Sequence, residues 1–107
     1  MNKPMWGVSM EIEFRLTPTQ DGGRKTSIVS GYRPNVIVKS ATGDDVIFGL
    51  AELDLAQPVQ PGASSRGVLR FDQSISPLVR THLRVDSEFA LSEGKWIVAT
   101  ARVLSLS

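Results

Sequence analysis

Alternation of apolar and polar side chains dominates the amino-terminal part of the chain. Every second position from 6 to 16 is apolar, namely Trp6, Val8, Met10, Ile12, Phe14 and Leu16. Polar residues, among them Glu11, Glu13 and Arg15, lie between them. Because successive side chains of a strand point to opposite faces of a sheet, this pattern predicts a strand with one buried and one exposed face.

Short apolar or β-branched segments, bounded by glycine and proline, follow along the rest of the chain. We expect further strands at residues 35–40, from 45 towards 53, and at 64–71, 83–91 and 96–106. Turns are expected at 41–44 and 92–95, and the proline-containing segment 55–62 is expected to be a connection. No stretch of ten or more residues has a helical period of 3.6, so no helix is predicted. Short strands separated by turns are typical of an all-β sandwich or barrel.

Composition indicates one globular domain without covalent cross-links. The 107 residues suffice for a single domain, residues 1–107, with one core. Twelve Lys and Arg against eleven Asp and Glu leave a net charge of +1, so any contact with nucleic acid needs a local basic patch. The absence of cysteine excludes disulfides and thiolate metal sites. With no apolar run long enough to span a bilayer and no secretory signal at the amino terminus, we expect a cytoplasmic protein.

Two motifs within thirteen positions do not resemble core segments. They are Gly-Gly-Arg-Lys-Thr at 22–26 and Gly-Tyr-Arg-Pro at 31–34. The first is suited to phosphate binding, because Arg24 can bind phosphate oxygens in a bidentate manner and Lys25 adds a second charge. An exposed loop whose cations serve solubility is the alternative. The second motif favours a structural role, since Gly31 permits positive φ and Tyr32 can bury its ring while its hydroxyl stays paired.

At this spacing the two motifs resemble the opening of the third, C-terminal β-barrel domain of elongation factor Tu. Asp-Val at 45–46, Pro-Gly at 61–62 and Glu-Phe-Ala-Leu-Ser-Glu-Gly at 88–94 extend the resemblance over most of the chain. The resemblance implies a six-stranded antiparallel closed β-barrel. In that family the domain packs on two other domains and grips the T-stem of aminoacyl-tRNA. Carried over by position, the resemblance implies RNA-binding candidates at Arg24, Lys25, Thr26, Glu93 and Gly94.

The closing strand departs from this family. After Glu-Gly the family continues with Gly-Arg-Thr-Val-Gly-Ala-Gly, whereas this chain has Lys-Trp-Ile-Val-Ala-Thr-Ala at 95–101. Trp96 thus occupies a position where the family keeps arginine. A copy without neighbouring domains must make their contact surface polar or bury it on something else, since large exposed apolar patches are uncommon in monomers. The interface candidates are therefore Trp96, Tyr32 and Arg33, and ordinary packing of Trp96 on the barrel wall is the alternative.

The sequence predicts no catalytic centre. The phosphate-binding loop of GTPases is missing, so we expect neither nucleotide binding nor hydrolysis. Ser76, His82 and Asp86 could form a hydrolase triad only on paper, because nothing places the serine on a strained turn. Asp44 and Asp45 lack the spaced oxygen ligands of a calcium loop, and we expect no metal site.

We therefore expect a non-catalytic binding module without a cofactor. Protein–protein interaction, with a partner or with another copy of the chain, is the favoured function, because a barrel without companion domains loses most of the family's tRNA contacts. The alternative is binding of an RNA backbone, including that of tRNA, through residues 22–26. Contact with a membrane is not expected.

Overall fold

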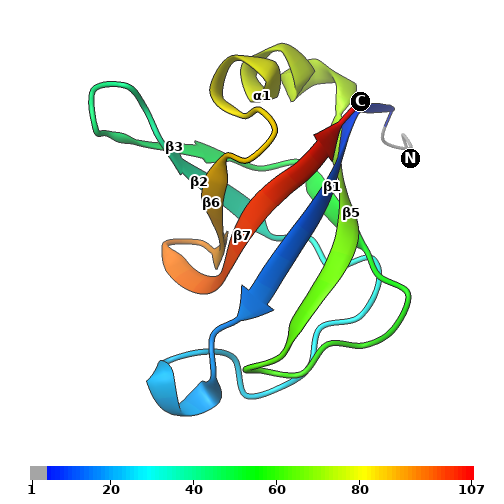
Figure 1. Ribbon diagram of the computed structural model, residues 1–107, viewed down its shortest axis with the longest axis vertical. Helices are drawn as coiled ribbons and strands as arrows, with labels where there is room; N and C mark the ends of the chain where they lie inside the picture. The colour runs from blue at the N-terminus through cyan, green and yellow to red at the C-terminus, as the bar shows by residue number, and fades with distance from the viewer. Residues whose placement is uncertain (1–4) are drawn as a thin grey trace.

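The computed structural model describes residues 5–107, which form one antiparallel sheet with seven strands (Figure 1). The strands are β1 (Trp6–Leu16), β2 (Asn35–Lys39), β3 (Asp45–Phe48), β4 (Ala51–Asp54), β5 (Ser64–Asp72), β6 (Glu88–Glu93) and β7 (Trp96–Leu106). Their order across the sheet is β3-β2-β6-β7-β1-β5-β4. The expected all-β antiparallel architecture is confirmed. Residues 1–4, on which the expectation of no secretory signal partly depends, lie outside the described part of the chain.

The expected closed barrel of six strands is wrong. The segment from 45 towards 53 is two strands, because Leu50 adopts a left-handed φ of 56° that ends strand geometry. β3 and β4 follow one another through Gly49 and Leu50, yet they form the opposite edges of the sheet. The sheet is therefore rolled so that its edges approach each other. Between the loop before β2 and the segment that begins with β4, the described residues form two isolated bridges, Tyr32 with Leu53 and Ile28 with Val59. No continuous strand pairing within residues 5–107 joins the two edges, so the sheet does not close into a barrel.

The strand β1 lies at the centre of this arrangement and organises the core. It pairs with β5 on one side and with β7 on the other. Its predicted alternation is confirmed, since the apolar residues from Val8 to Leu16 are buried and Trp6 is half-buried. These side chains belong to one hydrophobic cluster with residues from the other strands, including Phe48, Leu69 and Leu91. The interior of the rolled sheet is thus filled by side chains.

A short helical segment, which the sequence pattern did not predict, covers one end of the sheet (Figure 1). It consists of a 3-10 turn, η2 (Gln73–Ile75), followed by α1 (Ser76–His82); another 3-10 turn, η1 (Thr19–Asp21), follows β1. The expected strand over 83–91 is correspondingly shorter and begins at Glu88. Val79 of α1 and Leu83 are buried in the common core, so both residues serve packing at the end of a helix. Within the described residues no helix is long and apolar enough to cross a membrane.

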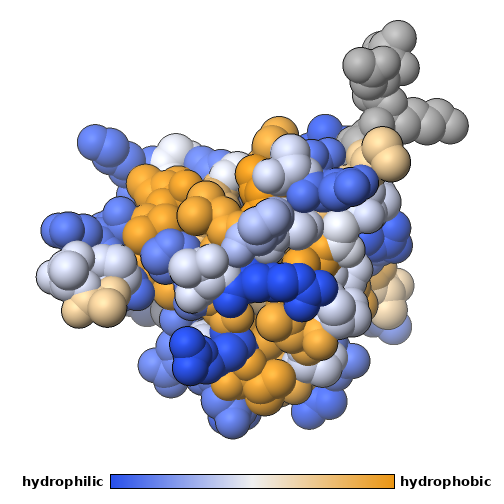
Figure 2. All heavy atoms as spheres, turned by 90° about the horizontal axis from the view of Figure 1, so that it is seen from above, coloured by the Kyte–Doolittle hydropathy of each residue, from blue (hydrophilic) through white to orange (hydrophobic). Residues whose placement is uncertain are grey.

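Apolar side chains also reach the surface in separate places. Figure 2 shows, from above, apolar patches that are divided by charged side chains. Exposed apolar residues near the strand ends and edges include Ile47, Leu50 and Ile97. No single apolar face identifies a partner, so the position of each patch relative to the strands matters for function.

Candidate functional site

Four of the candidate residues meet in a cluster between the loop after β1 and the end of β6. Arg24 forms an ion pair with Glu93, and the same carboxylate accepts a hydrogen bond from the Tyr32 hydroxyl. The Arg24 guanidinium carbon lies 5.2 Å from the centroid of the Tyr32 ring. Arg24 also donates from Nη2 to Thr26 Oγ1 at 3.1 Å and from Nε to the Thr26 carbonyl oxygen at 3.3 Å. We call Arg24, Thr26, Tyr32 and Glu93 the Arg24 cluster.

Two glycines bring the loop into this position. A Cβ atom on Gly23 would lie 1.9 Å from the carbonyl oxygen of Thr17, so only glycine permits this close approach. Gly31 has a φ of 93°, the left-handed conformation expected from the sequence, and places Tyr32 beside Leu53. The two sequence motifs are therefore adjacent in space because each contains a glycine at a position that other residues would strain.

The electrostatics of the Arg24 cluster favour an internal contact over a phosphate site. Burial raises the pKa of Tyr32 well above its ordinary value of 10.0, and the hydrogen bond to Glu93 raises it further. The hydroxyl is thus a donor at neutral pH and Glu93 accepts from two groups. The Arg24 charge is balanced by Glu93, and its side chain is 21% exposed. A phosphate would have to displace a carboxylate that already occupies the guanidinium.

The remaining sequence candidates lie around the Arg24 cluster without joining it. Lys25 and Gly94 are exposed, and Lys25 forms no ion pair with any residue from 5 to 107. Trp96 is 45% exposed, and its indole N–H donates to the Gly22 carbonyl oxygen at 2.8 Å. The Arg33 Nε lies 3.9 Å from a Glu52 carboxylate oxygen, and Arg33 is also exposed.

Trp96 therefore helps to hold the glycine loop on the β6–β7 turn. This contact differs from packing on the barrel wall, which was the alternative in the sequence analysis. Because almost half of the residue remains accessible, an additional contact with a partner stays a prediction.

The residues considered for catalysis and metal binding have structural contacts. The Ser76 hydroxyl accepts from the Val8 N–H at 2.9 Å and donates to the Asp72 carbonyl oxygen at 3.2 Å. The ring of His82 packs against Phe48, with 5.8 Å between the centroids. In the described part of the chain, no group of three or more His, Cys, Asp or Glu side chains is placed to hold a metal ion.

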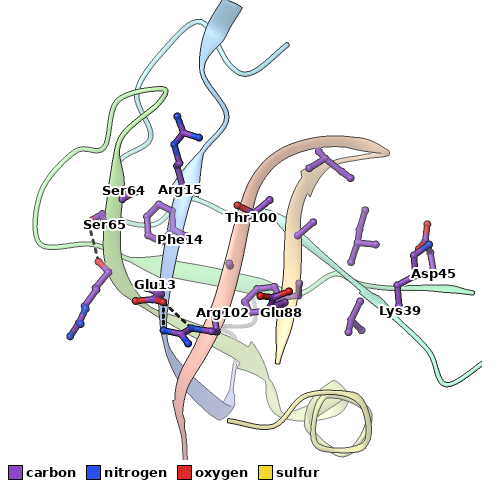
Figure 3. Close-up of a pocket in the computed structure, with 17 residues that line it drawn as sticks. Glu13, Phe14, Arg15, Lys39, Asp45, Ser64, Ser65, Glu88, Thr100 and Arg102 are labelled. Carbon is purple, nitrogen blue, oxygen red and sulfur yellow. Dashed lines mark hydrogen bonds and ion pairs between the residues drawn. The ribbon is translucent and has the colours of Figure 1, made fainter. Parts of the chain in front are cut away.

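A broad groove, which the sequence analysis did not predict, crosses the sheet on the face that points away from the core (Figure 3). Its volume is about 1180 Å³, and residues of β1, β2, β5, β6 and β7 line most of it. Pairing across the strands places one set of side chains in a row along this face. From β3 to β5 this groove row consists of Ile47, Ile37, Ala90, Thr100, Arg15 and Ser64. Ile47 extends the row beyond the groove itself.

The groove row is apolar at one end and polar at the other. Ile47 is 49% exposed, and Ile97 on β7, which lines the groove, is 48% exposed. Thr100, Arg15 and Ser64 form the opposite end. The face thus offers both an apolar contact area and hydrogen-bonding groups, a combination common at protein-binding surfaces.

Four cations and three acids line the groove, and most of them neutralise one another. Arg102 Nε donates to Glu13 Oε1 at 2.8 Å, and Lys39 Nζ lies 2.8 Å from Asp45 Oδ1. Figure 3 shows the Lys39–Asp45 pair at one end of the groove, and the Glu13–Arg102 pair nearer the middle. Glu88 lies opposite Arg102 in the sheet register, so this acid also faces a cation.

Two guanidinium groups at the other end of the groove are not neutralised in this way. Arg15 and Arg66 form no ion pair with any carboxylate of residues 5–107. Arg15 only donates a long hydrogen bond of 3.4 Å to the Gly62 carbonyl oxygen. Both residues are exposed and lie on adjacent strands. Glu13 is the register partner of Arg66, but its carboxylate is already engaged by Arg102 and forms no ion pair with Arg66. The groove therefore carries local positive charge at its β1–β5 end.

The sequence contained only part of the signal for this groove. Alternation predicts that Glu13 and Arg15 point away from the core. It does not predict which residues of other strands lie beside them, because that depends on register. Compared with known proteins, the chain matches no protein-family model and no curated sequence. The resemblance to the third domain of elongation factor Tu therefore stays a prediction.

Proposed function

We propose that this chain is a non-catalytic protein-interaction module that docks a partner protein in the groove on its sheet. The observation that carries the proposal is the groove with its row, in which the half-buried Ile37 and the exposed Ile47 and Ile97 share one face with hydrogen-bonding residues. An apolar contact area with a polar rim is the usual composition of a protein interface. The five interlinked strands provide a rigid base, so docking requires little ordering of the chain.

The relation to the third domain of elongation factor Tu is part of this proposal. Three segments that carry the sequence resemblance, 22–26, 31–34 and 88–94, come together at the Arg24 cluster. Contact between segments so distant in sequence supports a shared architecture. The rolled sheet here has seven strands and open pairing, so the proposed relation concerns the arrangement of these motifs and not a closed barrel.

RNA binding through residues 22–26 is the less favoured function. Its strongest cation, Arg24, is engaged by Glu93 and Thr26, and a carboxylate beside the site would repel phosphate. Lys25 alone is a single exposed charge, and one surface cation contributes little affinity. The overall charge of +1 does not compensate for this.

Affinity capture with three matched forms of the protein tests the proposal. Wild type is compared with Ile97→Asp, which places a charge in the groove, and with Lys25→Ala, which removes the free cation of the loop. Both positions are exposed, so each variant should keep the wild-type melting temperature. A charge at an apolar contact costs about 1–3 kcal/mol, which corresponds to a loss of affinity of about fivefold to more than a hundredfold.

The proposal expects a protein that is captured by wild type and by Lys25→Ala but lost with Ile97→Asp. Treatment with ribonuclease should not change the captured protein. Loss of capture with Lys25→Ala or after ribonuclease treatment, together with retention by Ile97→Asp, would favour the RNA-binding alternative. Failure of wild type to retain any protein would also contradict the proposal. Sedimentation of the purified chain then shows whether the docked protein is another copy or a different partner.

A further inference from the structure

Resting on this proposed function, we infer that the groove binds an extended acidic segment of a partner protein, with an apolar anchor residue and a carboxylate four positions away. The inference depends on the juxtaposition of the apolar end of the groove row with the two unneutralised guanidinium groups of Arg15 and Arg66. The two ends of the groove require different side chains, so together they define the occupant.

The apolar end provides the contact for the anchor. Ile37 on β2 is the register partner of the small Ala90 on β6, and Ile97 on β7 lines the same groove. An aliphatic or aromatic side chain seated on these residues removes apolar surface from water on both partners. The anchor supplies affinity without requiring a charged group.

The cationic end provides the contact for the acids. Guanidinium groups bind carboxylates through two parallel hydrogen bonds, and neither arginine has a carboxylate partner within residues 5–107. The acids of the groove are differently placed: Glu13 and Asp45 are already paired, and Glu88 faces Arg102. An occupant that complements the groove must therefore be negatively charged at the β1–β5 end.

The sheet geometry fixes the separation between these contacts. Ala90 pairs with Thr100, and Thr100 pairs with Arg15, so two strand spacings of roughly 10 Å in total separate the anchor from Arg15. Arg66 lies one strand further and two residues along it from the partner of Arg15, at roughly 16 Å from the anchor. An extended chain advances about 3.3 Å per residue and turns every second side chain to the same side, so an acid four residues from the anchor, at about 13 Å, faces the groove between the two arginines.

The arrangement favours a different partner over a second copy of the chain. The groove has an excess of cations, four against three acids, so two grooves facing each other would oppose like charges at their free arginines. An acidic segment of a different protein meets no such repulsion. Exposed arginines could also meet an RNA backbone, but phosphate contacts do not require an apolar anchor at a fixed distance.

Selection of a random-peptide display library on the folded full-length chain tests the inference. Enriched peptides should contain one apolar residue with Asp or Glu four positions away on one side. Selection on the double variant Arg15→Glu, Arg66→Glu should replace these acids with Lys or Arg. Peptides without a charge preference on either form would overturn the inference. So would the absence of any enriched peptide.

Binding measurements with one enriched peptide give the quantitative test. The double variant Arg15→Gln, Arg66→Gln should weaken binding about tenfold, whereas Lys25→Gln, which removes an equally exposed cation elsewhere, should leave binding unchanged. Equal affinity for both variants would contradict the inference. If polyuridylate binds as tightly as the peptide, and its binding is also lost in the Arg15→Gln, Arg66→Gln variant, the two arginines bind a nucleic acid instead.

The same peptides separate failure of the inference from failure of the proposed function. If the selected peptides lack acids but bind Ile97→Asp more weakly than wild type, the acidic specificity is wrong and the groove remains the docking surface. Peptides that bind Ile97→Asp as well as wild type overturn both. The melting temperature of every variant should lie within 2 °C of that of wild type, about 0.5 kcal/mol, because these positions are exposed. Such melting curves exclude unfolding as the cause of weaker binding.

Discussion

The hydroxyl of Tyr32 should stabilise the fold by linking the glycine loop to the end of β6. The variant Tyr32→Phe removes only this hydroxyl and its hydrogen bond to Glu93. A hydrogen bond to a charged group contributes about 1.5–3 kcal/mol. The Glu93 side chain is 32% exposed, which favours the lower limit, so we expect a loss of about 1.5 kcal/mol in the free energy of unfolding. For a domain of this size that corresponds to a decrease of about 6 °C in Tm.

The pH dependence of the same variant provides a second measurement. The pKa of Tyr32 is raised in the folded state, chiefly by burial, so above pH 10 the unfolded chain loses this proton first. The folded state then binds more protons, and its stability falls as pH rises. The advantage of wild type over Tyr32→Phe should be complete below pH 10 and shrink above it. The pKa of Lys39 is also raised, by its hydrogen bond to Asp45, but Lys39 is common to both proteins.

Urea denaturation at pH 7 and pH 11 measures both effects. Ser65→Ala, which removes an exposed hydroxyl with a hydrogen bond of 3.3 Å to the neighbouring residue, serves as control and should change stability by less than about 0.5 kcal/mol. Equal stability of Tyr32→Phe and wild type at pH 7 would refute the reasoning. A difference that stays constant up to pH 11 would refute the explanation of the raised pKa.

Three further predictions concern the fold. Gly23→Ala should lower the free energy of unfolding by about 3 kcal/mol, because a Cβ atom at this buried position would clash with the backbone. Gly43→Ala, at an exposed turn with open space at Cβ, should cost about 1 kcal/mol through its φ of 88°. Equal losses in urea denaturation would contradict this. Val79→Ala should lower the free energy of unfolding by about 2 kcal/mol, because the side chain is fully buried. Calorimetry measures this, and a loss below about 0.5 kcal/mol would mean that α1 is not packed on the core. Hydrogen bonds from Ser74 lower the pKa of Asp72 below its ordinary 3.8, so the stabilisation that they give is present above that pH and is lost as pH falls. The stability of Asp72→Asn should therefore fall less steeply with decreasing pH than that of wild type. Identical acid-denaturation curves would argue against the contact.

The sequence predicted the strands where local pattern alone determines them. The alternation from Val8 to Leu16 was sufficient to predict β1, because a half-buried strand needs one apolar face. The boundary at Leu50 was not predictable, since a left-handed leucine has no local signal and is held by its surroundings. The helix Ser76–His82 has only seven residues, too few for a helical period to emerge.

The candidate site shows the same limit. Arg24 and Tyr32 were singled out by their motifs, and the sequence also predicted a buried ring with a paired hydroxyl for Tyr32. That Glu93 neutralises Arg24 depends on the folding of a loop onto a distant turn. The groove depends on register as well, because Ile37 and Arg15 become parts of one surface only when the intervening strands align. Pattern along the chain predicts faces, whereas register determines which faces combine into a surface.

Methyl NMR of the isoleucines tests the docking surface most directly. The chain contains six isoleucines. Ile37 and Ile97 line the groove, Ile47 extends its row, and Ile12, Ile28 and Ile75 lie elsewhere. On addition of the protein captured by wild type, or of a peptide selected on it, the shifts should change at the three groove residues alone. Changes confined to Ile28, which lies just beyond the glycine loop, would contradict the groove and place the contact at residues 22–26.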